Sequence, residues 1–229
     1  MLLCIDSAGD WLTLALQKGT TLLAKHASLQ RHSHARAVLP LAQAMLQAHR
    51  LELSEVDCFG ACIGPGSFTG LRVGIVTVKS LAFAKQTPCV GIPSTEILAA
   101  SVDHDGPLGC AIDAKKGEAY FALYDQGGEG RNLLVEPFSE KPQAGLQRLL
   151  GEVDGNLLLV GSACEAYGDQ LKEVGSDRII FAPPHTAVPC PATLSRLCLK
   201  AYEDGLGVSP GVLEPMYVRP PSITTKKRP

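Results

Sequence analysis

The sequence has no long uninterrupted apolar run and no basic leader segment, and each absence excludes a class of protein. Its most apolar stretch, residues 70–84, contains Arg72 and Lys79, so it does not predict a membrane-spanning helix. The first residues, MLLCID, carry no basic side chain, and their apolar run stops at Asp6, which does not fit a signal peptide. We therefore expect a cytoplasmic protein that does not bind membranes.

An excess of basic charge is also missing. The formal net charge is -2 and the isoelectric point is near 6.3, whereas nucleic-acid binding draws affinity from Lys and Arg side chains at phosphates. Tight RNA binding by this chain alone is therefore not expected. The one basic cluster, Lys226-Lys227-Arg228, is interpreted as a solvated terminal tail.

The chain has eight cysteines but no Cys-x-x-Cys pair, so neither a zinc ribbon nor a disulfide framework is favoured. The cysteines are scattered through strand-like and helix-like apolar segments. We interpret most of them as buried, small hydrophobic residues.

What is present is an alternation of strand and helix patterns. The predicted elements are, in order, strands at 2–5, 11–17 and 21–27, a helix at 33–49, a strand at 58–63, a helix at 70–85, a strand at 89–92 and a helix at 94–102. Three strands joined by short turns predict an antiparallel meander, and the later alternation requires parallel pairing. The result is an α/β fold with a mixed sheet flanked by helices.

Strand patterns restart after the loop Asp103–Pro107, at 108–112, 118–124 and 132–137, followed by weaker helix and strand patterns and a last helix at 193–203. This restart predicts two lobes, residues 1–104 and 105–229, and we expect the last helix to pack back on the first lobe. No internal repeat is recognisable in the sequence.

One glycine-rich stretch, GPGSFTGLRVG at residues 64–74, joins a predicted strand to a predicted helix. Free amides and the helix dipole favour an anion at such a turn. However, Gly64-x-Gly66-x-x-x-Gly70 has one residue too many for the dinucleotide fingerprint, and no Gly-Lys-Ser/Thr follows. The alternative is a tight turn in which Ser67 or Thr69 caps the helix.

The sequence leaves both interpretations of the loop open, an anion-binding turn or a tight turn that starts a helix. It also leaves two roles open for Asp6, as a magnesium ligand at a nucleotide's phosphates or as a turn residue that caps nearby amides. Gly70 and Gly74, one helical turn apart, could also let a neighbouring helix approach. The candidate nucleotide-proximal residues are Asp6, Gly64, Gly66, Ser67, Thr69 and Arg72.

Two other motifs carry little chemistry. Arg31-His32-Ser33-His34 has no carboxylate or third histidine at helical spacing and is interpreted as a solvated helix start. Ser67 lacks the Gly-x-Ser-x-Gly elbow of a serine hydrolase.

Four ordered segments, LCIDSAGDWLTLAL, GPGSFTGLRVGIVTVKSLAFA, AIDAKKGEAYFALY and LEPMYVRPPS, closely resemble the bacterial TsaB (YeaZ) family of tRNA threonylcarbamoyladenosine biosynthesis proteins. The resemblance runs from Met1 to about Ser222. It implies a two-lobed actin-like, ribonuclease-H-like (ASKHA) fold. It also implies a role in attaching threonylcarbamoyl to the adenosine next to the anticodon, in tRNAs that read codons beginning with A.

The resemblance implies partners as well. The chain would act with its paralogue TsaD, which performs the transfer, and with the ATPase TsaE, so that tRNA is contacted only indirectly. TsaD holds a metal through a His-x-x-x-His pair, where this chain has Ile92 and Glu96. One carboxylate cannot supply the three protein ligands of such a site. We therefore expect a pseudoenzyme with no catalytic metal and no catalytic residues.

The second half of an ATP clamp is not expected either, because Ala114–Glu118 lacks the paired glycines that bring backbone against a phosphate. We expect no cofactor on the chain alone, and ATP or ADP only at the interface of a complex.

The resemblance places the TsaD contact on the first two helices. The partner-binding residues that it points to are Val38, Leu39, Ala42, Met45, Leu46, Gly70, Leu71, Gly74, Val78 and Leu81. An exposed aliphatic patch would associate with something, so a homodimer through the same face is expected when TsaD is missing.

Three alternatives are weaker. An active small-molecule kinase or ATPase of the same fold is favoured by Asp6 and the glycine loop but disfavoured by Pro65, which removes an amide donor. A metallopeptidase is disfavoured by the missing histidine pair. An interaction protein unrelated to tRNA is opposed only by the resemblance.

Overall fold

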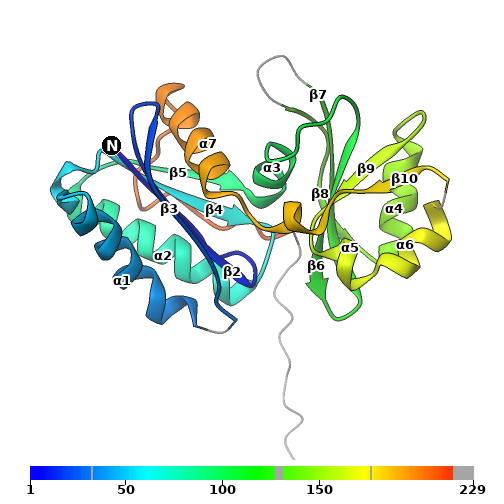
Figure 1. Cartoon of the computed structure of the whole chain (residues 1–229), viewed down its shortest axis with the longest axis horizontal. Helices are drawn as coiled ribbons and strands as arrows, with labels where there is room; N and C mark the ends of the chain where they lie inside the picture. Colours follow the sequence, from blue (N-terminus) through cyan, green and yellow to red (C-terminus); the bar gives the residue numbers. More distant parts are fainter. Residues whose placement is uncertain (32, 127–130, 176, 219–229) are drawn as a thin grey trace, which may run out of the picture.

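The chain folds into two α/β lobes that lie side by side (Figure 1). The computed structural model describes residues 1–31, 33–126, 131–175 and 177–218, so His32 and the basic cluster Lys226-Lys227-Arg228 lie outside the described residues. The first lobe contains β1 (Leu2–Asp6), β2 (Trp11–Lys18), β3 (Thr21–Leu29), α1 (His34–Ala48), the short η1 (Leu53–Glu55), β4 (Cys58–Gly64), α2 (Phe68–Lys85), β5 (Cys89–Pro93) and α3 (Ser94–Ala99).

The strand order of the first sheet is β3-β2-β1-β4-β5. The strands β1, β2 and β3 pair antiparallel, and β4 and β5 join them in parallel. The predicted mixed sheet and its order of strands and helices are confirmed.

The second lobe repeats this topology. It contains β6 (Leu108–Lys115), β7 (Glu118–Gln126), β8 (Arg131–Glu140), α4 (Pro142–Gly151), β9 (Leu157–Val160), α5 (Ala163–Ala166), α6 (Gly168–Gly175), β10 (Ile179–Phe181), η2 (Pro184–Ala187) and α7 (Pro191–Glu203). Its sheet order is β10-β9-β6-β7-β8. Read from the other end, as β8-β7-β6-β9-β10, it matches the first sheet, with three antiparallel strands followed by two parallel ones. The fold therefore contains a structural repeat that the sequence did not reveal.

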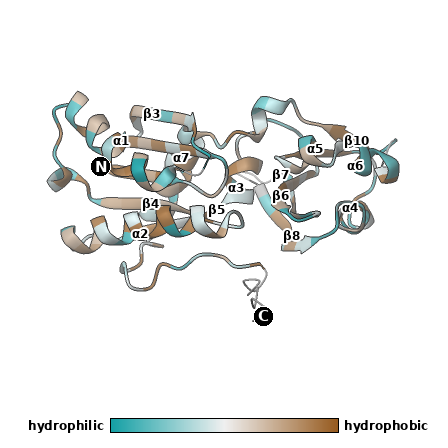
Figure 2. Cartoon of the chain, turned by 90° about the horizontal axis from the view of Figure 1, so that it is seen from below, coloured by the Kyte–Doolittle hydropathy of each residue, from teal (hydrophilic) through white to brown (hydrophobic). Residues whose placement is uncertain are grey.

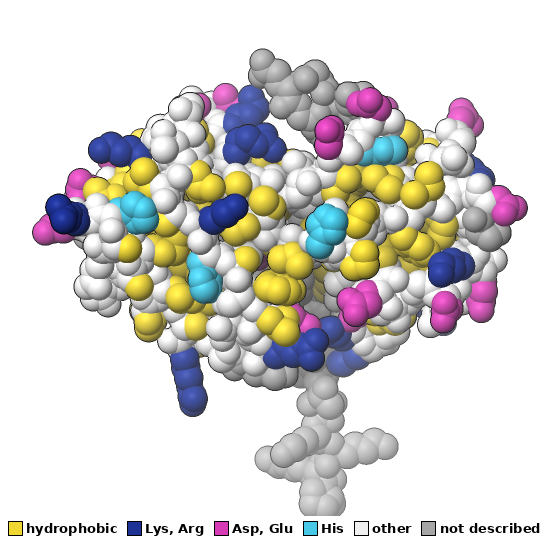
Figure 3. All heavy atoms as spheres, viewed as in Figure 1, with side chains coloured by type: hydrophobic (Ala, Val, Ile, Leu, Met, Phe, Trp, Pro, Cys, Tyr) yellow, Lys and Arg dark blue, Asp and Glu magenta, His cyan; other side chains and the backbone are white. Residues whose placement is uncertain are grey.

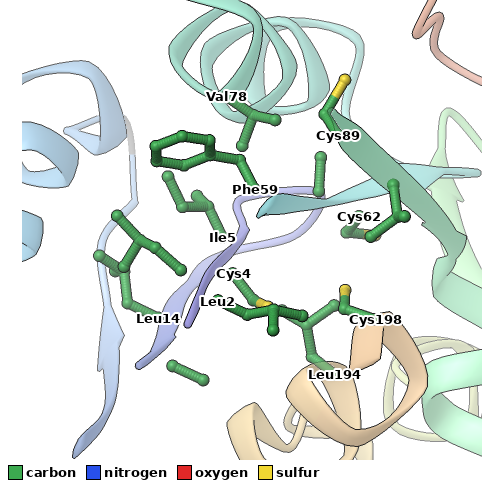
Figure 4. Packing of buried hydrophobic residues seen from close by; sticks show 14 of the residues in the cluster. Leu2, Cys4, Ile5, Leu14, Phe59, Cys62, Val78, Cys89, Leu194 and Cys198 are labelled. Atoms are coloured by element: carbon green, nitrogen blue, oxygen red, sulfur yellow. The ribbon is translucent and has the colours of Figure 1, made fainter. Parts of the chain in front are cut away.

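Both faces of the first sheet are covered, which explains why every residue of β1 is buried. Successive side chains of a strand point to opposite faces. Figure 4 shows Ile5 and Phe59 near Val78 of α2, while Leu2 and Cys4 lie toward Leu194 and Cys198 of α7. Cys4, Cys58, Cys62, Cys89 and Cys198 are all buried and unpaired in this lobe, as expected of cysteines that act as small hydrophobic residues.

The two lobes exchange helices. Helix α3 follows the last strand of the first sheet but packs on the second sheet, where Leu98 and Ala99 join a cluster with Leu108, Cys110 and Ala122. Helix α7 follows the second sheet and packs on β1, β2 and β5 of the first. Residue 104, after which the two lobes were expected to divide, lies between α3 and β6. Because of the exchange, one helix from each half of the sequence packs on the sheet of the other half.

The C-terminal strap, which we define as residues 208–218, returns to the first lobe beside α2 (Figure 2). Val208 exchanges two backbone hydrogen bonds of 2.9 Å with Cys89 at the edge of the sheet. Lys79 donates to the carbonyl of Leu213 at 2.9 Å, and the Met216 N–H donates to the carbonyl of Ile63 at 2.7 Å. These hydrogen bonds attach the strap to β5, α2 and β4.

No helix within the described ranges is long and apolar enough to cross a membrane.

Candidate functional site

Asp6 closes β1 and caps the turn that follows it. Its side chain is buried, and its Oδ1 accepts a 2.8 Å hydrogen bond from the Ala8 N–H. Burial raises the pKa of this carboxyl, while the Ala8 N–H, the Cys62 thiol and His34 act in the opposite direction. Of the two roles that the sequence allowed, this geometry is that of a turn cap.

The glycines of the loop allow the β1–β2 turn to lie directly against α2. A Cβ on Gly66 would lie 2.4 Å from the Ala8 carbonyl oxygen, and one on Gly70 would lie 2.2 Å from the Ser7 carbonyl oxygen. A Cβ on Gly74 would lie 2.5 Å from the Ser7 Oγ. Such distances exclude any side chain unless the neighbours move. Gly70 and Gly74 therefore make room for Ser7, and the proposed approach of another helix at these glycines was wrong.

Hydrogen bonds within the lobe use the polar groups of the loop. The Ser67 N–H donates to the Ala8 carbonyl at 2.7 Å, and the Ser7 hydroxyl donates to the Gly70 carbonyl at 2.8 Å. The Gly70 N–H donates to the Ser67 Oγ at 3.2 Å, so Ser67 is the N-cap of α2. The loop thus starts helix α2 and is hydrogen-bonded to the β1–β2 turn, and the capping alternative for Ser67 is confirmed.

The candidate nucleotide-proximal residues do not all meet. Asp6, Gly66 and Ser67 converge at the β1–β2 turn. Gly64 faces elsewhere, because a Cβ on it would lie 2.9 Å from the Leu71 Cδ1 and 3.2 Å from the Met216 carbonyl oxygen. Thr69 is exposed.

The Arg72 side chain contacts Phe68 and the strap. Its guanidinium lies 3.8 Å from the centre of the Phe68 ring, and its Nε donates to the Tyr217 hydroxyl at 3.1 Å. The rings of Phe68 and Tyr217 are 5.4 Å apart, in a tilted arrangement. Arg72 therefore anchors the strap to the start of α2.

The corresponding turn of the second lobe, between β6 and β7, is internally neutralised. Asp113 accepts hydrogen bonds from the Lys115 N–H at 2.7 Å and the Tyr167 hydroxyl at 2.9 Å, and it pairs with the Lys115 Nζ at 2.8 Å. Burial raises the pKa of Asp113, but these hydrogen bonds outweigh burial and leave it lowered. Lys115, Lys116 and Gly117 all have positive φ, of 63°, 58° and 80°, so the turn takes the left-handed conformation although two of its residues are not glycine.

His34 differs from the sequence interpretation. It is buried rather than solvated, and its Nε2 lies 2.9 Å from the Gly9 carbonyl. A carbonyl only accepts, so Nε2 is the donor. The helix start folds against the β1–β2 turn, and the sequence could not reveal this because the contact joins residues 25 positions apart.

Neither position that replaces the histidine pair supports a metal. Ile92 is buried in β5 and has no donor atom, and Glu96 lies in the first turn of α3. Among the described residues, His, Cys, Asp and Glu form no group of three that could hold a metal ion.

The structure corrects the choice of partner-binding residues. Val38, Ala42, Leu46, Leu71 and Val78 belong to the core of the first lobe, because an amphipathic helix turns its apolar stripe to its own sheet. Gly70 and Gly74 face Ser7, as described above. A partner can reach Leu39, which is exposed, and the partly buried Met45 and Leu81.

A different set of apolar side chains is exposed along α2. Val76 is 57% exposed and Phe83 is 78% exposed. We define the α2 outer face by these two residues together with the exposed Phe68 and the strap residues Val212 and Tyr217. The sequence carried a signal for this face: α2 is apolar on nearly all sides, so a core on one side leaves apolar residues on the other.

The charge distribution agrees with the composition. On the face shown in Figure 3, Lys and Arg side chains occur in several separate groups, with acidic and apolar side chains between them. This face offers no broad basic field for a nucleic-acid backbone.

Comparison with known proteins places the chain among tRNA-modification proteins. The sequence model of the family described as "TsaD: tRNA N6-adenosine threonylcarbamoyltransferase" matches residues 22–166. The tRNA threonylcarbamoyladenosine biosynthesis protein TsaB of Escherichia coli is 27% identical, over 100% of this chain and 98% of its own length. The TsaB protein of Bacillus subtilis is 28% identical, over 76% of each chain.

The solved structure of YeaZ from Pseudomonas aeruginosa has the same fold. It superposes with a TM-score of 0.78 at 25% identity, over 94% of this chain and 98% of that one. This agreement therefore includes both lobes.

Proposed function

This chain belongs to the TsaD family of tRNA N6-adenosine threonylcarbamoyltransferases, and from that membership we propose that it takes part in tRNA threonylcarbamoyladenosine biosynthesis as a non-catalytic subunit. It would bind and support TsaD, with TsaE joining the assembly. The modified base would be the adenosine next to the anticodon of tRNAs that read codons beginning with A.

The observation that carries the non-catalytic role is the use of the glycine loop by the chain itself. The Ser67 and Gly70 amides, the Asp6 carboxylate and the Ser7 hydroxyl all bond within the first lobe. A phosphate cradle needs amides that are free to point at the ligand. We therefore propose that the chain alone binds no nucleotide, and that ATP or ADP meets it only at the interface with a partner.

The α2 outer face supports the proposed docking of TsaD. Phe83 is 78% exposed, and Val76 on the same helix is exposed as well. A cluster of large exposed apolar side chains is typical of an interaction site. Leu39 and Met45 on the neighbouring α1 extend the apolar surface of the same lobe. The same face would form a homodimer when TsaD is missing, because a twofold contact uses one self-complementary patch.

The test of the function is threonine incorporation into unmodified tRNA. Purified threonylcarbamoyl-adenylate synthase, TsaD and TsaE are combined with labelled threonine, with and without this chain. We expect incorporation only when the chain is present. Undiminished incorporation without it would overturn the accessory role, and ATP turnover by the chain alone would favour the small-molecule kinase or ATPase instead.

The test of the docking face compares two matched substitutions. Val76→Asp places a charge on the α2 outer face, and Ile180→Asp places one on β10 of the other lobe, where the side chain is 50% exposed. We expect Val76→Asp, like Met45→Asp on α1, to abolish co-purification with TsaD and to yield monomers in gel filtration. Ile180→Asp should leave both associations unchanged. Equal retention of TsaD by all three variants would remove this face from the proposal.

A further inference from the structure

Helices α1 and α2 carry little charge, and none of it is negative. The 15 residues of α1 and the 18 residues of α2 contain no Asp or Glu. Their Lys and Arg side chains are Arg36, Arg72, Lys79 and Lys85, and none of the four forms an ion pair with a residue that the structure describes. The two helices therefore present an apolar, weakly cationic surface on a chain whose formal net charge is -2.

The two lysines of α2 point to carbonyl groups of the chain itself. Lys79 donates to the Leu213 carbonyl at 2.9 Å, and Lys85 donates to the Ser54 carbonyl. Both side chains thus attach neighbouring segments to α2. Arg72 is exposed, and it is the basic side chain of α2 that contacts the apolar side chains of the α2 outer face.

Arg72 is held in place by aromatic side chains from α2 and from the strap. Its guanidinium lies 3.8 Å from the centre of the Phe68 ring, and its Nε donates to the Tyr217 hydroxyl at 3.1 Å. We define these three residues as the Arg72 clamp. A guanidinium has further N–H donors on Nη1 and Nη2, and in Arg72 these make no hydrogen bond to a described residue. Because the clamp already fixes the guanidinium, binding an acceptor would cost little side-chain entropy.

We propose that the Arg72 clamp binds a carboxylate, an Asp or Glu side chain that the docking partner presents among apolar residues. The inference rests on the proposed docking of TsaD on the α2 outer face, which includes Phe68 and Tyr217. A guanidinium and a carboxylate form a bidentate pair with two parallel N–H···O bonds. A partner that covered Arg72 without such a group would leave a buried charge unpaired, which is strongly destabilising. The exposed Val76 and Phe83 on the same helix would help to exclude water around the pair.

The same chemistry disfavours a second copy of this chain as the occupant. In a twofold dimer through α1 and α2, each copy would bring helices without a carboxylate against Arg72 of the other. The strap carries one acidic residue, Glu214, which is exposed and forms no ion pair with Arg72 within the described structure. TsaD should therefore be preferred to a second copy, because complementary charge selects between partners.

The test measures the affinity of the full chain for purified TsaD by titration calorimetry, without nucleotide. Arg72→Gln should weaken this binding by at least about tenfold. Arg72→Lys should restore only part of it, because an ammonium keeps the charge but not the bidentate geometry. Arg148→Gln is the control: Arg148 is exposed on α4 of the other lobe, with its guanidinium 4.0 Å from the centre of the Phe138 ring, and this change should alter affinity less than about twofold.

Charge reversal separates a direct contact from a loosened strap. Arg72→Glu should abolish binding, and one variant of TsaD with a single Asp→Arg or Glu→Arg substitution should restore it. Loosening of the strap alone would not be repaired in this way, so failure of every such TsaD variant would overturn the proposal. Self-association is followed by sedimentation equilibrium, and Arg72→Gln should not weaken it. An equal loss in the homodimer would also overturn the proposal, since Glu214 of a second copy would then be the acceptor.

The outcomes also distinguish this contact from the docking face on which it rests. Retention of TsaD by Val76→Asp would remove the face itself. Loss of TsaD in Val76→Asp together with unchanged affinity in Arg72→Gln would overturn the carboxylate contact and leave the face in place. An effect of Arg72→Gln that appears only after ATP is added would mean that the guanidinium binds a phosphate, and it too would overturn the carboxylate contact.

Discussion

The contact between Ser7 and helix α2 can be tested by combining Gly74→Ala with Ser7→Ala. A Cβ on Gly74 would lie 2.5 Å from the Ser7 Oγ but 3.8 Å from the Ser7 Cβ, so the clash involves one oxygen atom. Overpacking of this kind costs about 1–3 kcal/mol. Ser7→Ala removes that oxygen together with its buried 2.8 Å hydrogen bond to the Gly70 carbonyl, at a cost of about 1 kcal/mol.

The effects of Gly74→Ala and Ser7→Ala on the free energy of unfolding should therefore not be additive. In the Ser7→Ala background the new methyl group meets the Ile5 Cγ2 at 3.7 Å and the residue 7 Cβ at 3.8 Å, both ordinary contact distances, so we expect a coupling free energy of about 1–2 kcal/mol. Gly151→Ala is the control, since nothing lies within 4 Å of its Cβ position, and its effect should be the same in both backgrounds.

Urea unfolding followed by circular dichroism measures each term of this cycle. A coupling of about 1.5 kcal/mol corresponds to a midpoint difference of about 0.5–1.5 M when m is about 1–3 kcal/mol per M. Additive effects of Gly74→Ala and Ser7→Ala would refute the reasoning, because they would mean that the glycine does not serve the approach of Ser7. Gly70→Ala should be more severe in either background, since its Cβ would meet a backbone oxygen at 2.2 Å.

Three further predictions follow from single side chains. Asp6→Asn keeps an oxygen that can accept the hydrogen bond from the Ala8 N–H. Because the folded-state pKa of Asp6 is raised, the wild type should lose stability relative to this variant as pH rises from about 4 through that pKa. A difference in the free energy of unfolding that stays constant from about pH 4 to 8 would contradict this. Cys190 should react with a thiol reagent in the native protein before Cys164, since hydrogen bonds from the start of α7 outweigh burial and lower the Cys190 pKa, whereas burial raises that of Cys164 to about 12; a Cys190→Ser variant that keeps the fast phase would disprove it. Leu213→Ala should destabilise the protein by about 2–5 kcal/mol because Leu213 is 5% exposed, whereas Val212→Ala, at 64% exposed, should change stability by less than about 0.5 kcal/mol in the same urea titration.

The sequence predicted the fold well where the signal is local. The short apolar or alternating runs of β1 to β3 and the helical spacing in α1 were readable from the order of apolar and polar side chains, and the observed elements agree with them. The N-cap at Ser67 was likewise readable from residue type. The sequence did not show which way the apolar stripe of a helix faces. Val38 and Val78 were therefore predicted to contact a partner, although they lie in the core.

The sequence by itself therefore determined the order of strands and helices, the unpaired state of the cysteines and the capped start of α2, because each depends on residue type and short-range spacing. Only the tertiary structure decided the exchange of α3 and α7, the repeat of the two lobes, and the approach of Ser7 to Gly70 and Gly74. The physical reason is that these features join residues far apart in the chain, and close packing selects such contacts only when the whole core is assembled.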